Sequence, residues 1–169
     1  MSGPDLLVDG FGRVREVVHD VLAGLGDAEL EYRTGAEANS ICWLIWHLTR
    51  VQDDHIAGAA GVEQVWSSGG WEKRFALPLE SSDIGYGHTS DEVALVRAPA
   101  GLLADYHDAT YEQTIEVLGG LTDTDMDTVV DRRWDPPVTM GVRLVSVLAD
   151  DLQHAGQAAF VRGLIESQA

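Results

Sequence analysis

Apolar residues recur at steps of three and four along much of this chain, and this periodicity constrains its fold more than any other feature. Between Asp5 and Gly24 the recurring residues are Leu7, Phe11, Val14, Val18, Val21 and Leu25. This spacing is typical of an amphipathic helix that buries one face. Gly24 and Gly26 then predict the end of the helix, since glycine favours helix C-termini.

Three further segments have the length and pattern of long helices. They run from a cap at Asn39 or Ser40 to about Ala57, from about Pro99 to Leu118, and from about Met140 to Glu166. Strand patterns are nearly absent. Four long helices therefore predict an all-α, four-helix bundle, and the 169 residues are enough for one domain over 1–169.

Residues 58–88 interrupt the helical pattern with a stretch rich in glycine and aromatic residues. The aromatic residues there are Trp66, Trp71, Phe75 and Tyr86. Such long loops are uncommon in compact domains and are often binding loops, so we expect this one to lie against the bundle between its second and third helices. Thr89 and Glu92 form a capping box that predicts a short helix to about Arg97.

Three prolines bear on the remaining boundaries. We expect Pro99 in the first turn of the third long helix, because a proline inside a helix is costly. The tandem Pro136-Pro137 excludes helix at that point of the segment 121–139.

The charge balance excludes several classes of function. Eleven basic residues against 28 acidic ones give a net charge of −17. Such a chain is repelled by phosphate backbones and anionic lipid, so we expect neither nucleic-acid nor membrane binding. The N-terminus has no basic and apolar signal segment, which predicts a cytoplasmic protein. Cys42 is the single cysteine, so we expect an inert buried thiol and no multi-cysteine zinc site.

The last long helix carries an unusual pair on its apolar side. Asp150 and His154 are four residues apart and therefore share one face of the helix. Val147 and Val161 flank them on this face, whereas we expect Asp151, Arg162 and Glu166 to lie on a polar sector elsewhere. A carboxylate directed inward is costly unless an imidazole or a metal ion neutralises it.

His47 presents the same feature on the second long helix. Its neighbours at one turn are Trp43, Leu44 and Val51, so it projects from an apolar face. Together His47, Asp150 and His154 form a set of two histidines and one carboxylate, which leaves open positions on a catalytic metal. A buried hydrogen bond between Asp150 and either histidine would satisfy the same pattern.

Several other side chains are candidates for supporting roles. Trp43 is a candidate wall of the site, and His88 in the long loop is placed to cover a pocket. Asp54, two turns beyond His47 on the same line, or a backbone carbonyl is expected to accept the second N–H of His47. The histidines predicted to be solvated or at the surface are His19, His55 and His107.

Arginine is the main basic residue in this acidic chain, and four arginines are candidates for binding an anion. They are Arg74, Arg132, Arg133 and Arg143. Surface ion pairing is the alternative for each of them.

Two short motifs resemble those of the DinB/YfiT-like superfamily, and the resemblance covers essentially the whole chain. They are Trp43-Leu44-Ile45-Trp46-His47-Leu48 on the second helix and Asp150-x-x-x-His154-Ala155-Gly156-Gln157 on the last. The resemblance implies a four-helix bundle with a metal held by His47, Asp150 and His154. Asp150 stands where members usually have histidine or glutamate, and Gln52 stands where many have an acidic residue. Gln157 is an expected supporting residue.

The resemblance also implies an activity. The chain is similar to the branch of this superfamily that contains mycothiol-dependent maleylpyruvate isomerase. This similarity implies a divalent metal, with zinc favoured over nickel or iron. The expected co-substrate is a low-molecular-weight thiol, such as mycothiol, that attacks a small-molecule electrophile in an S-transfer or cis–trans isomerisation. A homodimer is the expected assembly. Two alternatives remain open: a non-catalytic bundle that binds a small molecule or partner, and a non-haem iron enzyme with the same three ligands.

Overall fold

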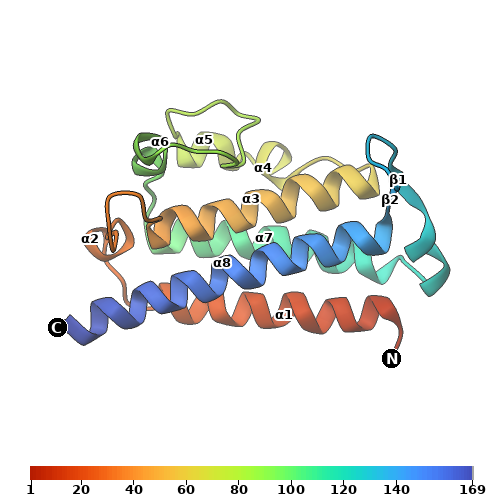
Figure 1. Cartoon of the computed structure of the whole chain (residues 1–169), viewed down its shortest axis with the longest axis horizontal. Helices are drawn as coiled ribbons and strands as arrows, with labels where there is room; N and C mark the ends of the chain where they lie inside the picture. Colours follow the sequence, from red (N-terminus) through yellow and green to blue (C-terminus); the bar gives the residue numbers. More distant parts are fainter. Residues whose placement is uncertain (169) are drawn as a thin grey trace.

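A computed structural model describes residues 1–168 and shows four long helices packed side by side (Figure 1). They are α1 (Gly3–Leu22), α3 (Ile41–Ala60), α7 (Ala100–Gly119) and α8 (Met140–Gln168). α3 and α1 each pack against both α7 and α8, and the buried apolar side chains between the helices form two clusters. The predicted all-α four-helix bundle is confirmed. Among the described residues, no helix is long and apolar enough to cross a membrane.

The helix ends follow local capping chemistry. The Ser2 hydroxyl accepts from the Asp5 amide at the start of α1, and the Ser40 hydroxyl accepts from the Trp43 amide at the start of α3. Gly61, at a φ of 69°, ends α3 in the left-handed region. Pro99 is the cap that precedes α7, not a residue of its first turn, because its ψ of 152° is extended.

The segment between α3 and α7 is more ordered than predicted. It contains α4 (Val65–Ser68), α5 (Trp71–Phe75) and the expected capped helix α6 (Ser90–Leu95), which stops before Arg97. The rings of Trp66, Trp71 and Phe75 are buried and lie within 5.2 to 5.6 Å of the Tyr106 ring centre on α7. These contacts hold the aromatic-rich loop on the bundle. The short helix α2 (Asp27–Leu30) lies at the end of the bundle where α1 ends and α3 begins (Figure 1).

A small hairpin lies at the opposite end of the bundle. After the 3₁₀ helix η1 (Asp123–Asp127), strand β1 (Val129–Asp131) pairs antiparallel with β2 (Val138–Thr139), and Val129 lies opposite Thr139. The tandem prolines lie in the turn between these strands. Strands this short leave no alternating pattern in a sequence, so they were not predicted.

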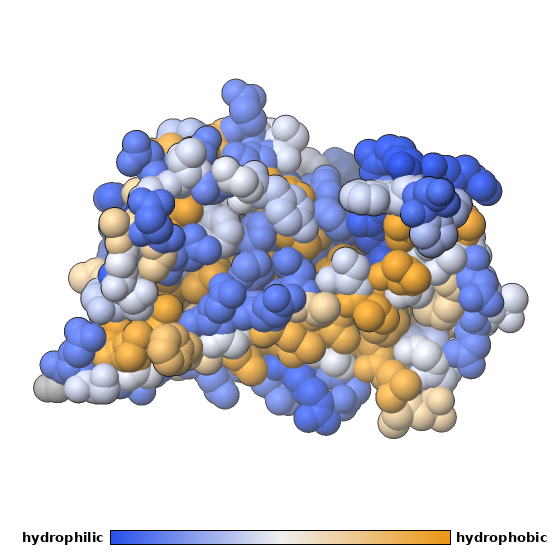
Figure 2. Space-filling model, in the orientation of Figure 1, coloured by the Kyte–Doolittle hydropathy of each residue, from blue (hydrophilic) through white to orange (hydrophobic). Residues whose placement is uncertain are grey.

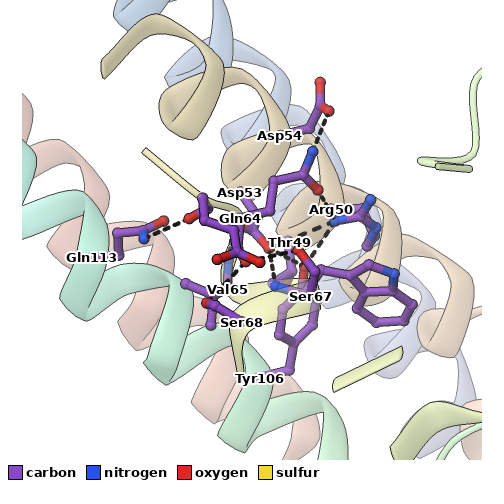
Figure 3. Close-up of polar contacts among 12 residues, drawn as sticks. Thr49, Arg50, Asp53, Asp54, Gln64, Val65, Ser67, Ser68, Tyr106 and Gln113 are labelled. Atoms are coloured by element: carbon purple, nitrogen blue, oxygen red, sulfur yellow. Dashed lines mark hydrogen bonds and ion pairs between the residues drawn. The ribbon is translucent and has the colours of Figure 1, made fainter. Parts of the chain in front are cut away.

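A buried polar network fastens α4 to the bundle (Figure 3). The Asp53 carboxylate accepts from the amides of Val65 and Trp66, each at 2.8 Å, and from the Tyr106 hydroxyl at 2.7 Å. Arg50 donates to the Tyr106 hydroxyl at 3.2 Å. Both Arg50 and Asp53 are buried, so the buried part of the second long helix extends past its apolar first two turns.

Two expectations of solvation are wrong. His107 on α7 and Asp151 on α8 are both buried. Burial lowers the pKa of His107 to about 4 and raises the pKa of Asp151 well above its usual range. A bundle helix contacts two neighbours, so its buried sector is wider than the apolar stripe that its sequence displays.

Candidate metal site

Three side chains from two antiparallel helices meet in the bundle. His47 lies in the second turn of α3, and Asp150 and His154 lie in the middle of α8. Each offers a ligand atom, and these atoms all lie within 4.8 Å of one another. The rings of His47 and His154 are 4.8 Å apart at an interplanar angle of 79°. The structure thus brings together the three residues that the spacing suggested.

His47 is held in the neutral form and in one orientation. Its Nδ1 donates to the backbone carbonyl of Ile84 in the long loop, which leaves the Nε2 lone pair free. Burial lowers the pKa of His47 to about 4 against the weaker opposing effect of this hydrogen bond. A neutral imidazole with a free nitrogen is the form in which histidine binds metals.

His154 is oriented in the same way by Gln157. Its Nδ1 donates to the Gln157 side-chain oxygen at 3.0 Å, so its Nε2 faces Asp150, with 3.6 Å between Nε2 and Oδ1. Burial opposes protonation of His154, but its contacts with Asp150 and Gln157 outweigh burial and raise its pKa. The same contact with His154 lowers the pKa of Asp150 despite burial, so this carboxylate is ionised.

The donor set fits a divalent cation. Three atoms within 4.8 Å of one another have a common point no more than about 2.8 Å from each, and small side-chain shifts bring this to the ~2.0–2.2 Å of zinc bonds. The Asp150 Oδ2 atom is buried and has no hydrogen-bond partner among the described residues. A buried, unpartnered carboxylate oxygen beside two free imidazole nitrogens is an arrangement that a cation would stabilise.

The predicted supporting residues lie around the trio, with one exception. Trp43 stacks on His47 with 4.5 Å between ring centres, and its Nε1 donates to His88 Nδ1 at 3.0 Å. The His88 side chain is 4% exposed and contacts Asp83 through its other nitrogen, so it covers the Trp43 ring and not the ligand atoms of the trio. Asp54 does not contact His47: it accepts from Gln64 at 2.8 Å and pairs with His55.

Sequence reasoning missed the contribution of the loop around Gly85. Gly85 has a φ of 96°, and a Cβ atom built on this residue would lie 2.6 Å from His47 Nδ1. Only glycine therefore allows the chain to approach closely enough for the Ile84 carbonyl to accept from His47. An isolated glycine in a loop carries no local signal of this role.

A pocket of about 250 Å³ opens beside the trio. Asp150 lines it together with His55, Tyr86 and Gln153, among others. The His55 side chain is only 19% exposed, so the expectation of a surface histidine is wrong, while the His19 side chain is 42% exposed. The opening gives a small molecule a path to one side of the Asp150 carboxylate.

The remaining candidates divide between the surface and a second pocket. Cys42 is buried, and burial raises the pKa of its thiol to about 12, in line with the inert thiol expected. Arg74 is at the surface, where it lies over the Trp71 ring and 3.6 Å from Asp105. The other three arginines line a pocket at the hairpin end, described below.

The architecture and the donor set define a class: helical bundles with two histidines and a carboxylate placed to bind one metal ion inside the bundle. A sequence profile of the mycothiol S-transferase family matches residues 6–167. The chain belongs to this family, which confirms the DinB-like resemblance. The comparison with functionally curated proteins gave no match.

Two solved structures are similar to this chain. A conserved protein from Enterococcus faecalis is 33% identical, covers 99% of both chains and superposes with a TM-score of 0.91. A DinB-like protein from Bacillus cereus ATCC 10987 is 16% identical over 95% of this chain and 91% of its own, with a TM-score of 0.63. The second similarity supports the fold alone.

Proposed function

We propose that this protein is a metal-dependent S-transferase, or isomerase, that joins a low-molecular-weight thiol of the mycothiol type to a small-molecule electrophile. The observation that carries the proposal is the convergence of His47, Asp150 and His154 beside an open pocket. Zinc is the metal that we propose, with nickel and iron as alternatives, because imidazole and carboxylate donors suit all three. The family match supports the thiol.

The chain's own residues orient the donors and shape the site. A divalent ion bound by the trio would supply Lewis acidity that lowers the pKa of the incoming thiol. The Ile84 carbonyl and Gln157 each accept from one histidine, which directs both Nε2 atoms inward. The stacked Trp43 ring keeps water from the His47 face. The side of the trio that faces the pocket lined by Asp150 remains open for both substrates.

The reaction forms a bond between the thiol sulfur and an electrophilic carbon. The thiol proton is released to solvent, and either a leaving group departs with the electron pair of its bond or the pair moves into an adjacent unsaturated group. In the second case, addition turns a carbon–carbon double bond into a single bond; rotation about that carbon–carbon bond, followed by elimination of the thiol with re-formation of the double bond, would give a cis–trans isomerisation.

Metal content tests this proposal first. Protein purified without an affinity tag is expected to contain about one equivalent of zinc by elemental analysis, and His47→Ala, Asp150→Ala and His154→Ala are expected to lose it. His19→Ala is the matched control, since His19 pairs with Asp108 on the outside of the bundle. A His47→Ala variant with full metal content would contradict the ligand assignment.

The same measurement separates the alternatives. One equivalent of iron, with no thiol conjugation by the iron-loaded protein, would favour the non-haem iron enzyme. Absence of any metal would favour a bundle that binds a small molecule or partner without catalysis. Zinc-loaded protein that conjugates mycothiol to an electrophile such as monochlorobimane, and does so faster than the metal-free protein, would support the S-transferase.

The outer face of α8 supports a homodimer as the assembly. Eight residues between positions 142 and 163 are exposed and uncharged and do not line the pocket beside the trio: Val142, Val145, Leu152, Gly156, Gln157, Ala159, Phe160 and Gly163. We call them the α8 face; Figure 2 shows apolar side chains gathered where α8 crosses the front of the molecule. Contiguous exposed apolar surface marks interaction sites.

A second copy of the chain is the partner that we propose for the α8 face. Large residues such as Leu152 and Phe160 alternate along it with small residues such as Gly156 and Gly163, so two antiparallel copies can interlock. An uncharged contact also avoids the repulsion between two chains of net charge −17. We propose a cytoplasmic location because the thiol must stay reduced.

A further inference from the structure

Three arginines that the proposed chemistry does not use surround one pocket at the hairpin end of the bundle. Arg132 and Arg133 follow β1, and Arg143 lies in the first turn of α8. Together with the last turns of α3 they line a pocket of about 280 Å³. The chain has only eleven basic residues, so three of them at one pocket is a marked concentration of positive charge.

Asp131 holds two of these guanidinium groups in place. Its side chain is 8% exposed and accepts from Arg133 Nε at 3.0 Å and Nη2 at 2.8 Å, and from Arg143 Nη2 at 3.1 Å. The hydrogen bonds from Arg133 hold the pKa of Asp131 far below its usual range, so the carboxylate stays ionised. Arg132 is exposed and makes no ion pair with any residue of 1–168.

The lining carries a net positive charge. The three arginines and the two carboxylates of Asp131 and Asp54 give 3 − 2 = +1, in a chain whose net charge is −17. An anion that approaches most of the surface is repelled, whereas in this pocket it meets guanidinium groups whose planar N–H donors suit a carboxylate. One net positive charge matches one carboxylate better than a phosphate dianion.

This pocket adjoins the one beside the trio. His55 lines both pockets, and Asp150 lines the second. Arg143 and Asp150 are seven residues apart on α8, which is two helical turns or about 10 Å along the axis. A ligand that reaches both sites therefore has its anionic group about 10 Å from its reacting atom.

We infer that the arginine pocket binds a carboxylate of the electrophile, so that the substrate class is an electrophile with an acid group about 10 Å from the reacting carbon. This inference rests on the proposed S-transferase function. Mycothiol itself carries no carboxylate, which assigns the acid to the electrophile and not to the thiol.

The test compares two electrophiles that differ in one charge. Zinc-loaded protein and mycothiol are assayed with 6-maleimidohexanoic acid, whose extended chain has about the required length, and with its methyl ester. Wild-type protein is expected to prefer the acid by about tenfold in kcat/KM, and Arg143→Gln or Arg132→Gln to reduce this preference severalfold. Arg74→Gln, at a surface ion pair, should retain it. Because Arg132 is exposed and unpaired, R132Q is not expected to disturb folding.

The outcomes separate this inference from the proposed function. Turnover of acid and ester at equal rates by wild-type protein overturns the inference and leaves the S-transferase intact. Preference for 6-maleimidohexyl phosphate over the acid overturns the carboxylate assignment. If neither compound is turned over, the proposed S-transferase function fails. Calorimetric binding of the unreactive 6-succinimidohexanoate then tests the arginine pocket by itself. Binding that R132Q weakens supports the carboxylate inference, and absence of binding overturns it.

Discussion

At the scale of single residues, Gly85 controls the orientation of His47. Gly85→Ala would place a methyl group 2.6 Å from His47 Nδ1 and 3.1 Å from the Trp46 ring, at a φ of 96° that alanine rarely adopts. The loop must then retreat and the Ile84 carbonyl with it. Zinc affinity, measured by competition with a chelating dye, is expected to fall by about 10- to 100-fold.

Gly87→Ala is the matched control for this substitution. Gly87 also has a positive φ, of 72°, but a Cβ atom there meets nothing within 4 Å. The variant should lose about 1 kcal/mol of stability to backbone strain and keep its zinc affinity. Equal loss of zinc affinity in both variants would show that loop strain, and not the contact with His47, is responsible.

His107 predicts how stability depends on pH. Its pKa is about 4 in the buried site, and about 6.5 is usual for an exposed histidine, so the unfolded chain binds more protons between these values. This difference in proton binding by His107 alone should lower the free energy of unfolding by about 2 kcal/mol as the pH drops from 7 to 4.5. Urea unfolding of metal-free protein at both pH values measures this.

His107→Leu isolates this contribution. The variant keeps His47 and every other titrating group, so the difference between its pH slope and that of the wild type reports His107 alone. The slope of the variant should be smaller by about the same 2 kcal/mol over this range. Parallel slopes would mean that His107 is not buried in the neutral form.

At the scale of elements, α4 depends on a carboxylate from another helix. With four residues α4 cannot persist by itself, and Asp53 on α3 accepts from two of its amides. Asp53→Ala leaves these amides without an acceptor and the buried Arg50 without its carboxylate partner, at an expected cost of about 3–5 kcal/mol in urea unfolding. A red shift of Trp66 fluorescence before global unfolding should accompany it.

Asp54→Ala provides the comparison on the adjacent position. The Asp54 side chain is 37% exposed, and its contacts with Gln64 and His55 lie near solvent, so its loss should cost less than about 1 kcal/mol. Similar costs for the two aspartates would contradict the special role of Asp53 in Figure 3.

At the scale of the whole molecule, the α8 face predicts the assembly. Light scattering should give a mass of twice 18.3 kDa, and Leu152→Glu and Phe160→Glu should each give monomers, because each buries two unpaired carboxylates, one per chain, in an uncharged contact. Val62→Glu adds the same charge to an exposed apolar position outside this face and should stay dimeric. A wild-type monomer at tens of micromolar would contradict the proposed homodimer.

The sequence predicted the positions of the helices better than the burial of the side chains on them. The four long helices, the caps at Ser40 and Thr89, and the apolar faces that carry His47, Asp150 and His154 all follow from relations within four residues along one helix. The resemblance to the DinB-like superfamily implied that these three side chains meet. The burial of His107 and Asp151 does not, because it depends on how many neighbours a helix face contacts. α4 was missed because its stability comes from Asp53, a residue outside it.

The amino-acid sequence by itself determined the bundle, the acidic surface and the three donors, because helical periodicity records which residues share a face. Only the tertiary structure decided that the Ile84 carbonyl orients His47 in place of Asp54, and that three arginines gather at one pocket. Those arrangements arise where a loop, a hairpin and two helix ends meet in space, and contacts between distant segments leave no periodic trace along the chain.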